Sequence, residues 1–342
     1  GHAAQVVTLH ALMQPGDELI AARQLYGGSI NQFNHSFKSF GWHVVWADAE
    51  DVSSIERALS PKTKAIFIES IANPGGVITD IEAIANIARK AGVPLIVDNT
   101  LATPYLCKPI EHGADIVVHS LTKFLGGHGN SIGGAIVDCG TFDWMKSKHK
   151  YATLSEPNPS YNNMRLGETF GNFAFAIACR VLGLRDIGPA LSPFNAFLIL
   201  TGIETLPLRM QRHCDNAITV AEWLSQHSKV AWVSYPGLPG DRYHSLAQKY
   251  CPQGAGSVFT FGLKGGYEAG VKLVSNVRLF SHLANIGDTR SLIIHPASTT
   301  HRQLSDAQKI QAGAGPDVVR LSIGLEDVQD IIADLEEGLG GA

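Results

Sequence analysis

Residues 65–98 read AIFIESIANPGGVITDIEAIANIARKAGVPLIVD and contain two apolar runs with an amphipathic segment between them. The runs, Ala65–Ile68 and Pro94–Val97, do not alternate with polar residues, which is typical of strands buried on both faces of a sheet. Between them, apolar residues recur at i, i+3, i+4 and i+7 from Ile81, as in a helix with one buried face. A strand, a helix and a second strand in this order predict a parallel sheet with a right-handed crossover.

The expected helix has signals for its start and its end. Thr79 and Glu82 are spaced as a capping box, in which the Thr79 side chain accepts a backbone N–H and the Glu82 side chain reaches back to another. Gly92 supplies the left-handed residue that ends many helices. Further apolar runs of the same kind are Glu18–Ala22, His43–Trp46, Asp115–Val118 and Ala135–Val137. The first half of the chain is therefore predicted to be an α/β domain with a mostly parallel sheet.

The second half of the chain has a different pattern. Residues 193–227 have a largely helical pattern, and a last helix is expected over about Asp327–Leu339, ending at Gly340–Gly341. The short strands expected between these helices are Val230–Ser234, Ser257–Phe261 and Val318–Ser322. This mixture predicts a smaller α+β domain, so we expect a division into residues 1–210 and 211–342.

Composition limits the class of protein. The chain is 45% hydrophobic and 17% charged, which supports a buried core, and 27 Lys and Arg against 31 Asp and Glu leave no basic surplus for nucleic acid. Five scattered cysteines without a C-x-x-C pair fit a cytoplasmic protein. No apolar run is long enough to span a membrane, so no membrane partner is expected. His295 and His301 lack a third ligand in the sequence, so no metal site is expected either.

Polar residues follow several of the predicted strands, where ligands of a parallel sheet collect. Asp98 ends a buried strand, and Lys123 comes just after the next one. One interpretation is a simple ion pair between these two side chains. The other is a pyridoxal phosphate between them, with the carboxylate holding the pyridine nitrogen protonated and the lysine forming a Schiff base with the aldehyde. Ser120 and Thr122 would then bind the phosphate, and Gly126–Gly127 would let the backbone turn closely past it.

Two other kinds of glycine-rich phosphate site do not fit the spacing. A P-loop requires G-x-x-x-x-G-K-[ST], but here Lys123 follows the hydroxyl residues and precedes the glycines. A dinucleotide fingerprint would need a third glycine after Gly127 and Gly129, and that position is Ile132. The sequence therefore argues against a nicotinamide dinucleotide.

Five motifs occur in order along the chain. They are Leu25–Ser29, Val97–Thr100, Ser120–Lys123, His295–His301 and Arg320–Asp327. Together they resemble the Cys/Met-metabolism, or trans-sulfuration, family of pyridoxal-phosphate enzymes over essentially the whole chain. The resemblance implies the aspartate-aminotransferase-like fold (fold type I), a large cofactor domain before the small C-terminal domain, and a homo-oligomer built as a dimer of dimers. It also implies an N-terminal arm, which this sequence lacks, and we expect that an N-terminal piece is missing.

The resemblance implies roles for individual residues at the cofactor. Lys123 is expected to be the Schiff-base lysine, and Asp98 the partner of the pyridinium nitrogen. The expected phosphate ligands are the hydroxyls of Ser120 and Thr122 and the amides of Gly1 and His2. These two amides open a helix, and a helix N-terminus suits an anion.

Four further residues match family positions around the ring and the substrate. Tyr26 matches the tyrosine that stacks on the cofactor ring and assists proton transfer, and Asn73 a residue that contacts the phenolic oxygen. Arg320 matches the clamp for the substrate's α-carboxylate, a role that suits a two-pronged donor. Asn285 aligns with a family serine that touches the same carboxylate. Taken alone, Tyr26 could be an ordinary loop aromatic and Arg320 a member of a structural ion pair.

Resemblance to individual branches of the family also indicates which reaction to expect. Ser192–Phe197, Gly202–Met210 and Glu156–Tyr161 look like the O-acetylhomoserine sulfhydrylase branch, and Gly28 stands where methionine γ-lyases usually carry a reactive cysteine. We therefore expect a pyridoxal-phosphate-dependent transferase that uses O-acetyl-L-homoserine with sulfide or methanethiol. Alternatives are cystathionine γ-synthase, O-succinylhomoserine sulfhydrylase, and methionine or cystathionine γ-lyase. A non-catalytic binding protein that kept the fold is the alternative from another class.

Overall fold

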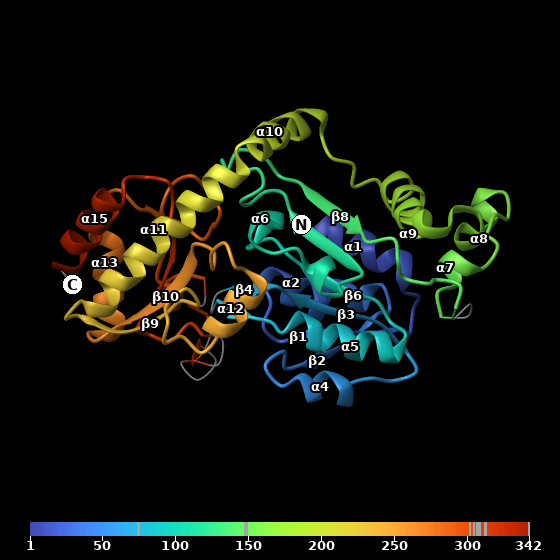
Figure 1. Ribbon diagram of the computed structural model, residues 1–342, viewed down its shortest axis with the longest axis horizontal. Helices are drawn as coiled ribbons and strands as arrows, with labels where there is room; N and C mark the ends of the chain where they lie inside the picture. The colour runs from blue at the N-terminus through green and yellow to red at the C-terminus, as the bar shows by residue number, and fades with distance from the viewer. Residues whose placement is uncertain are drawn as a thin grey trace.

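The computed structural model describes the whole chain except residues 74–75, 147–149, 301, 304, 306–308, 311–312 and 341–342. The described residues form a six-stranded sheet, a five-stranded sheet and a small two-stranded sheet. Figure 1 shows the two larger sheets in two bodies that lie side by side. The helices α10 (Pro193–Glu204) and α11 (Leu206–Gln226) cross from the first body to the second.

The six-stranded sheet contains all six strands predicted from the apolar runs. In spatial order they are β2 (His43–Ala47), β1 (Glu18–Ala22), β3 (Thr63–Glu69), β6 (Leu95–Asp98), β7 (Ile116–Ser120) and β8 (Gly134–Asp138). The first five strands are parallel, and β8 pairs antiparallel with β7 at the edge. Ala65–Ile68 of β3 and Leu95–Val97 of β6 are buried and apolar on both faces of the sheet.

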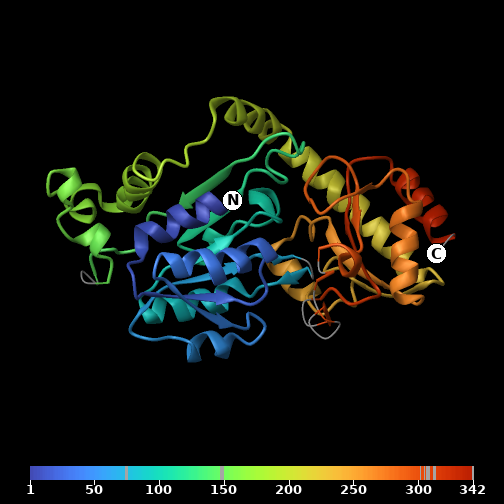
Figure 2. The same ribbon diagram turned by 180° about the vertical axis from the view of Figure 1, so that it is seen from behind.

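Helices cover both faces of this sheet. In this half they are α1 (His2–Leu12), α2 (Gly27–Asn31), α3 (Phe37–Ser39), α4 (Val52–Arg57), α5 (Ile81–Ala91), α6 (Thr103–Leu106), α7 (Ala152–Ser155), α8 (Leu166–Phe170) and α9 (Ala174–Ala178). The helix α5 lies in front of the sheet in Figure 1, and α1 lies in front in the reverse view of Figure 2. The segment with α7, α8 and α9 extends beyond the sheet on the side away from the second body. The predicted stop of α5 at Gly92 is confirmed, since this residue has a left-handed φ of 64°.

The start of α5 differs from the prediction. The capping box between Thr79 and Glu82 is wrong, because the buried Thr79 hydroxyl donates instead to the carbonyl oxygen of Glu69 at 2.7 Å. Asp80 is the N-cap, and its carboxylate accepts the N–H of Ala83 at 3.3 Å. The Thr79 contact ties the start of the helix to the end of β3.

The five-stranded sheet forms the second body. Its strands in spatial order are β11 (Ser281–His282), β12 (Leu292–Ile294), β13 (Val318–Ser322), β10 (Val258–Leu263) and β9 (Val230–Ser234). The predicted strands β9, β10 and β13 are confirmed, and their pairings are antiparallel. Its further helices are α12 (His244–Tyr250), α13 (Gly266–Asn276) and α15 (Val328–Gly340). The expected last helix is therefore present, and Gly341 lies outside the described residues.

The short remaining elements connect these layers. They are β4 (Ile71–Ala72), β5 (Val77–Ile78), the 3₁₀ turns Pro109–His112, Pro159–Tyr161, Gly171–Phe173 and Pro296–Ser298, and the π-helical segments Gln32–Ser36 and Cys179–Arg185. Within the described part of the chain, no helix has the length and apolar character needed to cross a membrane. The five cysteines are free thiols.

The register of the parallel strands places the predicted site. Asp98 at the end of β6 pairs with Glu69 at the end of β3 and with Val118 of β7. Lys123 follows β7 by three residues, so it lies at the same carboxyl edge of the sheet. The antiparallel strand β13 carries Arg320 from the second body. The site is therefore assembled where the two bodies meet.

Candidate active site

A cavity of about 1080 Å³ opens at this carboxyl edge, between the two sheets. Nine of the ten predicted site residues line it: Gly1, His2, Tyr26, Asn73, Asp98, Ser120, Thr122, Lys123 and Arg320. The tenth, Asn285, lies between the lining residues Ala284 and Ile286. The fold therefore brings together residues that are up to 319 positions apart in the sequence.

Asp98 is a buried carboxylate held by neutral donors. It accepts hydrogen bonds from the Thr100 hydroxyl at 2.5 Å, from the Thr100 N–H at 3.0 Å and from the side-chain amide of Gln5 at 3.4 Å. Burial raises the pKa of Asp98, and the hydrogen bonds from Thr100 and Gln5 act in the opposite direction. These donors fix the orientation of the carboxylate without neutralising its charge. Such a group suits a cationic N–H of a ligand in the cavity.

Lys123 lies on the turn after β7, and its amine donates a hydrogen bond to the side-chain oxygen of Asn285. Burial, and secondarily the charge of Arg320, lower the pKa of Lys123. Among the described residues no ion pair joins Lys123 to Asp98, although both line the cavity. The simple ion-pair interpretation is therefore wrong for this structure. A lysine with a lowered pKa beside a cavity suits covalent attachment to a carbonyl group.

The turn after Lys123 is held by a segment of the second body, Gly287–Ser291, which we call the linking segment. A Cβ on Gly287, which has a φ of +73°, would come within 2.7 Å of the Phe124 nitrogen, so the two backbones are in direct contact. The N–H of Thr289 donates to the carbonyl of Gly127 at 2.9 Å. The backbone around the lysine is thus fixed by a part of the chain more than 160 residues away.

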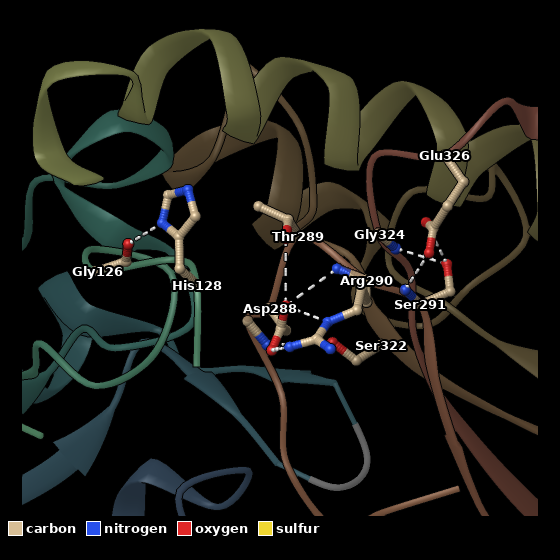
Figure 3. Close-up of polar contacts among 10 residues, drawn as sticks. Gly126, His128, Asp288, Thr289, Arg290, Ser291, Ser322, Gly324 and Glu326 are labelled. Carbon is tan, nitrogen blue, oxygen red and sulfur yellow. Dashed lines mark hydrogen bonds and ion pairs between the residues drawn. The ribbon is translucent and has the colours of Figure 1, made fainter. Parts of the chain in front are cut away.

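Figure 3 shows how the linking segment is itself fixed. The buried Asp288 carboxylate accepts the Arg290 N–H at 3.2 Å and pairs with the Arg290 side chain at 3.4 Å. Further along, the Glu326 carboxylate accepts the Ser291 N–H at 2.6 Å and the Ser291 hydroxyl at 2.9 Å. The first residue of the segment is bound to β13, because the Gly287 N–H donates to the Ser322 hydroxyl at 3.2 Å. These bonds connect the lysine turn to the strand that carries the predicted carboxylate clamp.

Arg320 reaches the cavity from β13. It donates to the side-chain oxygen of Asn73 at 3.2 Å and to the main-chain oxygen of Asn285 at 3.3 Å. Burial lowers its pKa to about 10, so the guanidinium stays charged at neutral pH. No aspartate or glutamate of the described residues pairs with it, which removes the structural ion pair as its explanation there. A partly buried cation held by neutral acceptors is suited to binding an anionic ligand.

The N-terminus of α1 and the end of β7 form one wall of the cavity. A Cβ on Gly1 would come within 2.9 Å of the Ser120 side chain, so this helix end and the Ser120 hydroxyl adjoin. The Thr122 hydroxyl accepts the N–H of Gly133 at 3.1 Å nearby. Backbone N–H groups at a helix start, together with hydroxyl groups, are suited to binding a phosphate. The predicted phosphate ligands therefore lie together, and their role remains a prediction.

Tyr26 is held by its backbone, while its ring faces the cavity. Its N–H donates to the Glu69 carboxylate at 2.7 Å, and its ring stacks on that of His2 with centroids 6.0 Å apart. A Cβ on Gly28 would come within 2.3 Å of the Tyr26 ring. A side chain at position 28 therefore requires the ring to move, which explains in steric terms why glycine stands there.

Gln5 and Glu69 line the cavity and make hydrogen bonds to site residues, but neither had a role in the sequence analysis. Gln5 donates to both Asp98 and the Ser29 hydroxyl, and Glu69 holds the Tyr26 backbone. A signal existed for Glu69, because it ends a buried strand as Asp98 does. Gln5 gave no such signal, since its partners are distant in the sequence.

Other predicted features are not part of the cavity lining. Gly127 has a φ of +74°, and a Cβ there would come within 2.2 Å of the Arg209 guanidinium, so its close contact is with that side chain. Both ring nitrogens of His295 have partners, the Ser298 hydroxyl at 2.9 Å and the Pro316 carbonyl at 2.8 Å. His301 lies outside the described residues. Within the described ranges, no group of three or more His, Cys, Asp or Glu residues is placed to hold a metal.

Comparisons with known proteins agree with this geometry. The Cys/Met metabolism PLP-dependent enzyme family matches residues 1–340. An O-acetyl-L-homoserine sulfhydrylase of Leptospira meyeri is 49% identical over 99% of this chain and 78% of its own length. O-acetyl-L-homoserine sulfhydrylase 1 of Thermus thermophilus is 51% identical over 99% of this chain and 80% of its own length. A homocysteine synthase of Schizosaccharomyces pombe is 46% identical over 99% and 79%, respectively.

A solved structure has the same fold. It is a Campylobacter jejuni protein assigned as an O-acetylhomoserine (thiol)-lyase, with N'-pyridoxyl-lysine-5'-monophosphate in its chain. It superposes with a TM-score of 0.94 at 40% identity and covers 99% of this chain and 80% of that chain. The predicted fold type I, an α/β fold with a mostly parallel central sheet, is confirmed. This chain belongs to the Cys/Met metabolism family of pyridoxal-phosphate-dependent enzymes.

Proposed function

We propose that this chain catalyses γ-replacement on O-acetyl-L-homoserine. Sulfide or methanethiol replaces the acetate, giving L-homocysteine or methionine and free acetate. The observation that carries this proposal is that Lys123, Asp98 and Arg320 line one cavity. Relatives at 46–51% identity, the O-acetyl-L-homoserine sulfhydrylases and the homocysteine synthase, support the choice of reaction.

The residues around the cavity fit pyridoxal phosphate as the cofactor. The start of α1 and the Ser120 hydroxyl adjoin and present donors to a phosphate, and the buried Asp98 lines the same cavity. Tyr26 lines the cavity and is 47% exposed, so its ring is accessible to the ring of a ligand. When bound, pyridoxal phosphate supplies an aldehyde that attaches the substrate amine and a ring that draws electrons from the α-carbon.

The side chains of this chain then have separate tasks. Arg320 binds the α-carboxylate of the substrate with two parallel N–H groups, which orients the α-carbon. Lys123, with its lowered pKa, takes the α-proton as a neutral amine. Asp98 keeps a proton on the ring nitrogen of the cofactor, so that negative charge from the α-carbon is stabilised. A second proton then leaves the β-carbon, acetate leaves the γ-carbon, and the thiol adds there. Return of the protons to the β- and α-carbons completes the product.

Product analysis tests this proposal. The protein with pyridoxal phosphate, O-acetylhomoserine and sulfide is expected to release homocysteine and acetate in equal amounts. Parallel mixtures with O-succinylhomoserine, with cysteine as the thiol, and with methionine alone separate the alternative enzymes. Failure to form homocysteine, with product in one of the parallel mixtures, would assign the chain to that reaction. A protein with no product and no absorbance of bound cofactor would be a binding protein.

We also propose that the chain forms a homo-oligomer, a dimer of dimers, with no membrane or nucleic-acid partner, and that it is cytoplasmic. Its small-molecule substrates follow from the family. The support for assembly is an apolar face of α10, where Phe194, Phe197 and Leu200 are 68%, 63% and 61% exposed. This helix lies along the outer edge of the molecule in Figure 1. Exposed apolar residues that gather on one face are typical of a surface that packs against a second copy.

Light scattering on the purified chain tests the assembly. A mass of four chains is expected, and Phe197→Glu should lower it, whereas Glu222→Lys on α11 should leave it unchanged. A single-chain mass for the unaltered protein would refute the proposal.

The division into a large domain, residues 1–210, and a small domain, residues 211–342, remains our proposal. Its support is that all strands of the six-stranded sheet lie before residue 139 and all strands of the five-stranded sheet after residue 229. The helix α11 runs unbroken through the proposed boundary.

A further inference from the structure

Glu69 and Asp98 form a pair of carboxyl groups at the edge of the sheet. Glu69 ends β3 and Asp98 ends β6, and the two are register partners in neighbouring parallel strands. In-register residues project to the same face of a sheet, and both line the cavity. Their exposed fractions are 3% and 9%, so neither carboxyl group is well solvated. Two neighbouring carboxyl groups that are this buried do not both ionise readily.

The two groups have unequal sets of donors. Asp98 accepts three hydrogen bonds, including one at 2.5 Å from a hydroxyl. In Glu69, Oε1 accepts the Tyr26 N–H at 2.7 Å, while Oε2 is buried and has no hydrogen-bond partner among the described residues. A buried oxygen without partners costs more free energy when it carries charge than when it is a neutral hydroxyl, so the donors favour charge on Asp98 and a proton on Glu69.

The electrostatics of the pair point the same way. Burial, followed by the charge of Asp98, raises the pKa of Glu69 well above its usual value, and the hydrogen bond from the Tyr26 N–H opposes this. The pKa of Asp98 is also raised by burial, but the Thr100 and Gln5 donors lower it. The cationic side chains that line the same cavity among the described residues are Lys123 on the β7 turn, Arg320 on β13 and Arg180, and the N-terminal amino group of Gly1 lies there as well.

We propose that Glu69 is a positioning residue that stays a neutral carboxylic acid, with its proton on Oε2 and its Oε1 holding the Tyr26 backbone. The negative charge at this edge then resides on Asp98, where the proposed cofactor contact needs it. The Glu69 main chain is fixed as well, since its carbonyl accepts the Thr79 hydroxyl at 2.7 Å. Tyr26 is thereby placed relative to Asp98 through two paired strands. This inference rests on the proposed function for the roles of Tyr26 and Asp98 but not for the protonation of Glu69.

The protonation is tested by infrared spectroscopy on the cofactor-free protein at about pH 8. Glu69→Gln should remove a carbonyl stretch of a protonated carboxyl group from the spectrum. Asp115→Asn is the matched control: burial raises the pKa of Asp115 to about 6, so it is ionised at this pH and its removal should leave the band in place. A wild-type spectrum without such a band, or a band that survives in Glu69→Gln, would overturn the proposal.

The neighbouring charge is tested in the same assay. In Asp98→Asn the repulsion between the two carboxyl groups is gone, so the Glu69 band should disappear at a lower pH than in the wild type. An unchanged or higher pH of disappearance would show that Asp98 does not govern the proton.

The positioning role is tested by cofactor binding. Glu69→Gln keeps a carbonyl oxygen for the Tyr26 N–H and should bind pyridoxal phosphate as the wild type does, with an unchanged pH profile of kcat/KM. Glu69→Ala leaves that N–H without its acceptor, and Glu69→Asp shortens the side chain, so each should weaken binding by roughly tenfold. Equal weakening in Glu69→Gln and Glu69→Asp would overturn the positioning role, even if Glu69→Ala fails to fold. If the infrared spectra are as expected but the protein forms no homocysteine, the proposed function is refuted and the protonation of Glu69 is not.

Discussion

Replacing Thr100 by valine tests how the structure holds Asp98. The Thr100 hydroxyl has two partners: it donates to the Asp98 carboxylate at 2.5 Å and accepts the Ser120 N–H at 2.8 Å. Valine has nearly the same shape, and the site is buried, so the change removes hydrogen bonds with little loss of packing. It leaves Asp98 with the Thr100 N–H and Gln5, and it leaves the Ser120 N–H without that acceptor.

The size of the effect follows from these two bonds. A hydrogen bond to a charged group contributes about 1.5–3 kcal/mol, which corresponds to a further rise of roughly 1–2 units in the pKa of Asp98. An unsatisfied buried N–H costs about 1–3 kcal/mol at every pH. The pKa of Asp98 is already raised in the folded protein, so its ionisation destabilises the fold as pH rises. In Thr100→Val the ionisation of Asp98 destabilises the folded state more than in the wild type. The difference in unfolding free energy between the two proteins therefore grows as pH rises and then levels off.

The assay is denaturant unfolding of the cofactor-free protein at about pH 5 and about pH 8. We expect Thr100→Val to lose more unfolding free energy at the higher pH. The control is Thr219→Val on α11, a partly buried residue whose hydroxyl donates to the Asp215 carbonyl at 2.9 Å. A loss for Thr100→Val that does not exceed the control, or that is the same at both pH values, would refute this account of Asp98.

Other substitutions test the remaining side chains of the site. Lys123→Ala should lose the absorbance of lysine-bound cofactor, and turnover should fall by more than the ~10²–10⁴ typical of acid–base catalysis; an active, yellow variant contradicts its role. Asp98→Asn should keep that absorbance but lose turnover, and unchanged turnover would argue against the stabilisation of charge by Asp98. Arg320→Lys keeps the charge but not the fork, so KM for O-acetylhomoserine should rise roughly tenfold, and an unaltered KM would exclude a bidentate contact. Gly28→Ala should weaken cofactor binding, because the added Cβ would lie 2.3 Å from the Tyr26 ring, whereas Gly27→Ala, with no atom within 4 Å, should not; equal affinities would show that the ring moves freely.

The fold was predictable where one strong local pattern sufficed. The strands of the central sheet are continuous apolar runs. Gly92 ends α5 in a left-handed conformation that glycine adopts easily, so this residue predicts the helix end without tertiary contacts. The capping box failed because Thr79 has a competing acceptor, the Glu69 carbonyl, which lies ten residues earlier. The strands β11 and β12 have two and three residues, too few to give a periodic pattern.

The candidate site was predictable in its members but not in its contacts. The polar residues at strand ends and the family motifs located Asp98, Lys123 and Arg320 in one place. The contacts between them depend on tertiary packing: the Asn285 side chain that accepts from Lys123 is 162 residues away. The same holds for the Tyr26 backbone and Glu69, which are 43 residues apart. No local pattern records such pairs.

The position of Lys123 depends on the linking segment, which belongs to the C-terminal third of the chain. Gly287 passes the lysine turn with no room for a side chain, and its N–H is anchored to Ser322, two residues from Arg320 on the same strand. A fragment that stops near residue 210 would retain the lysine and the aspartate yet lose the framework that sets their mutual orientation. In the intact chain, β13 both carries Arg320, the proposed substrate contact, and anchors the segment that positions the Lys123 amine.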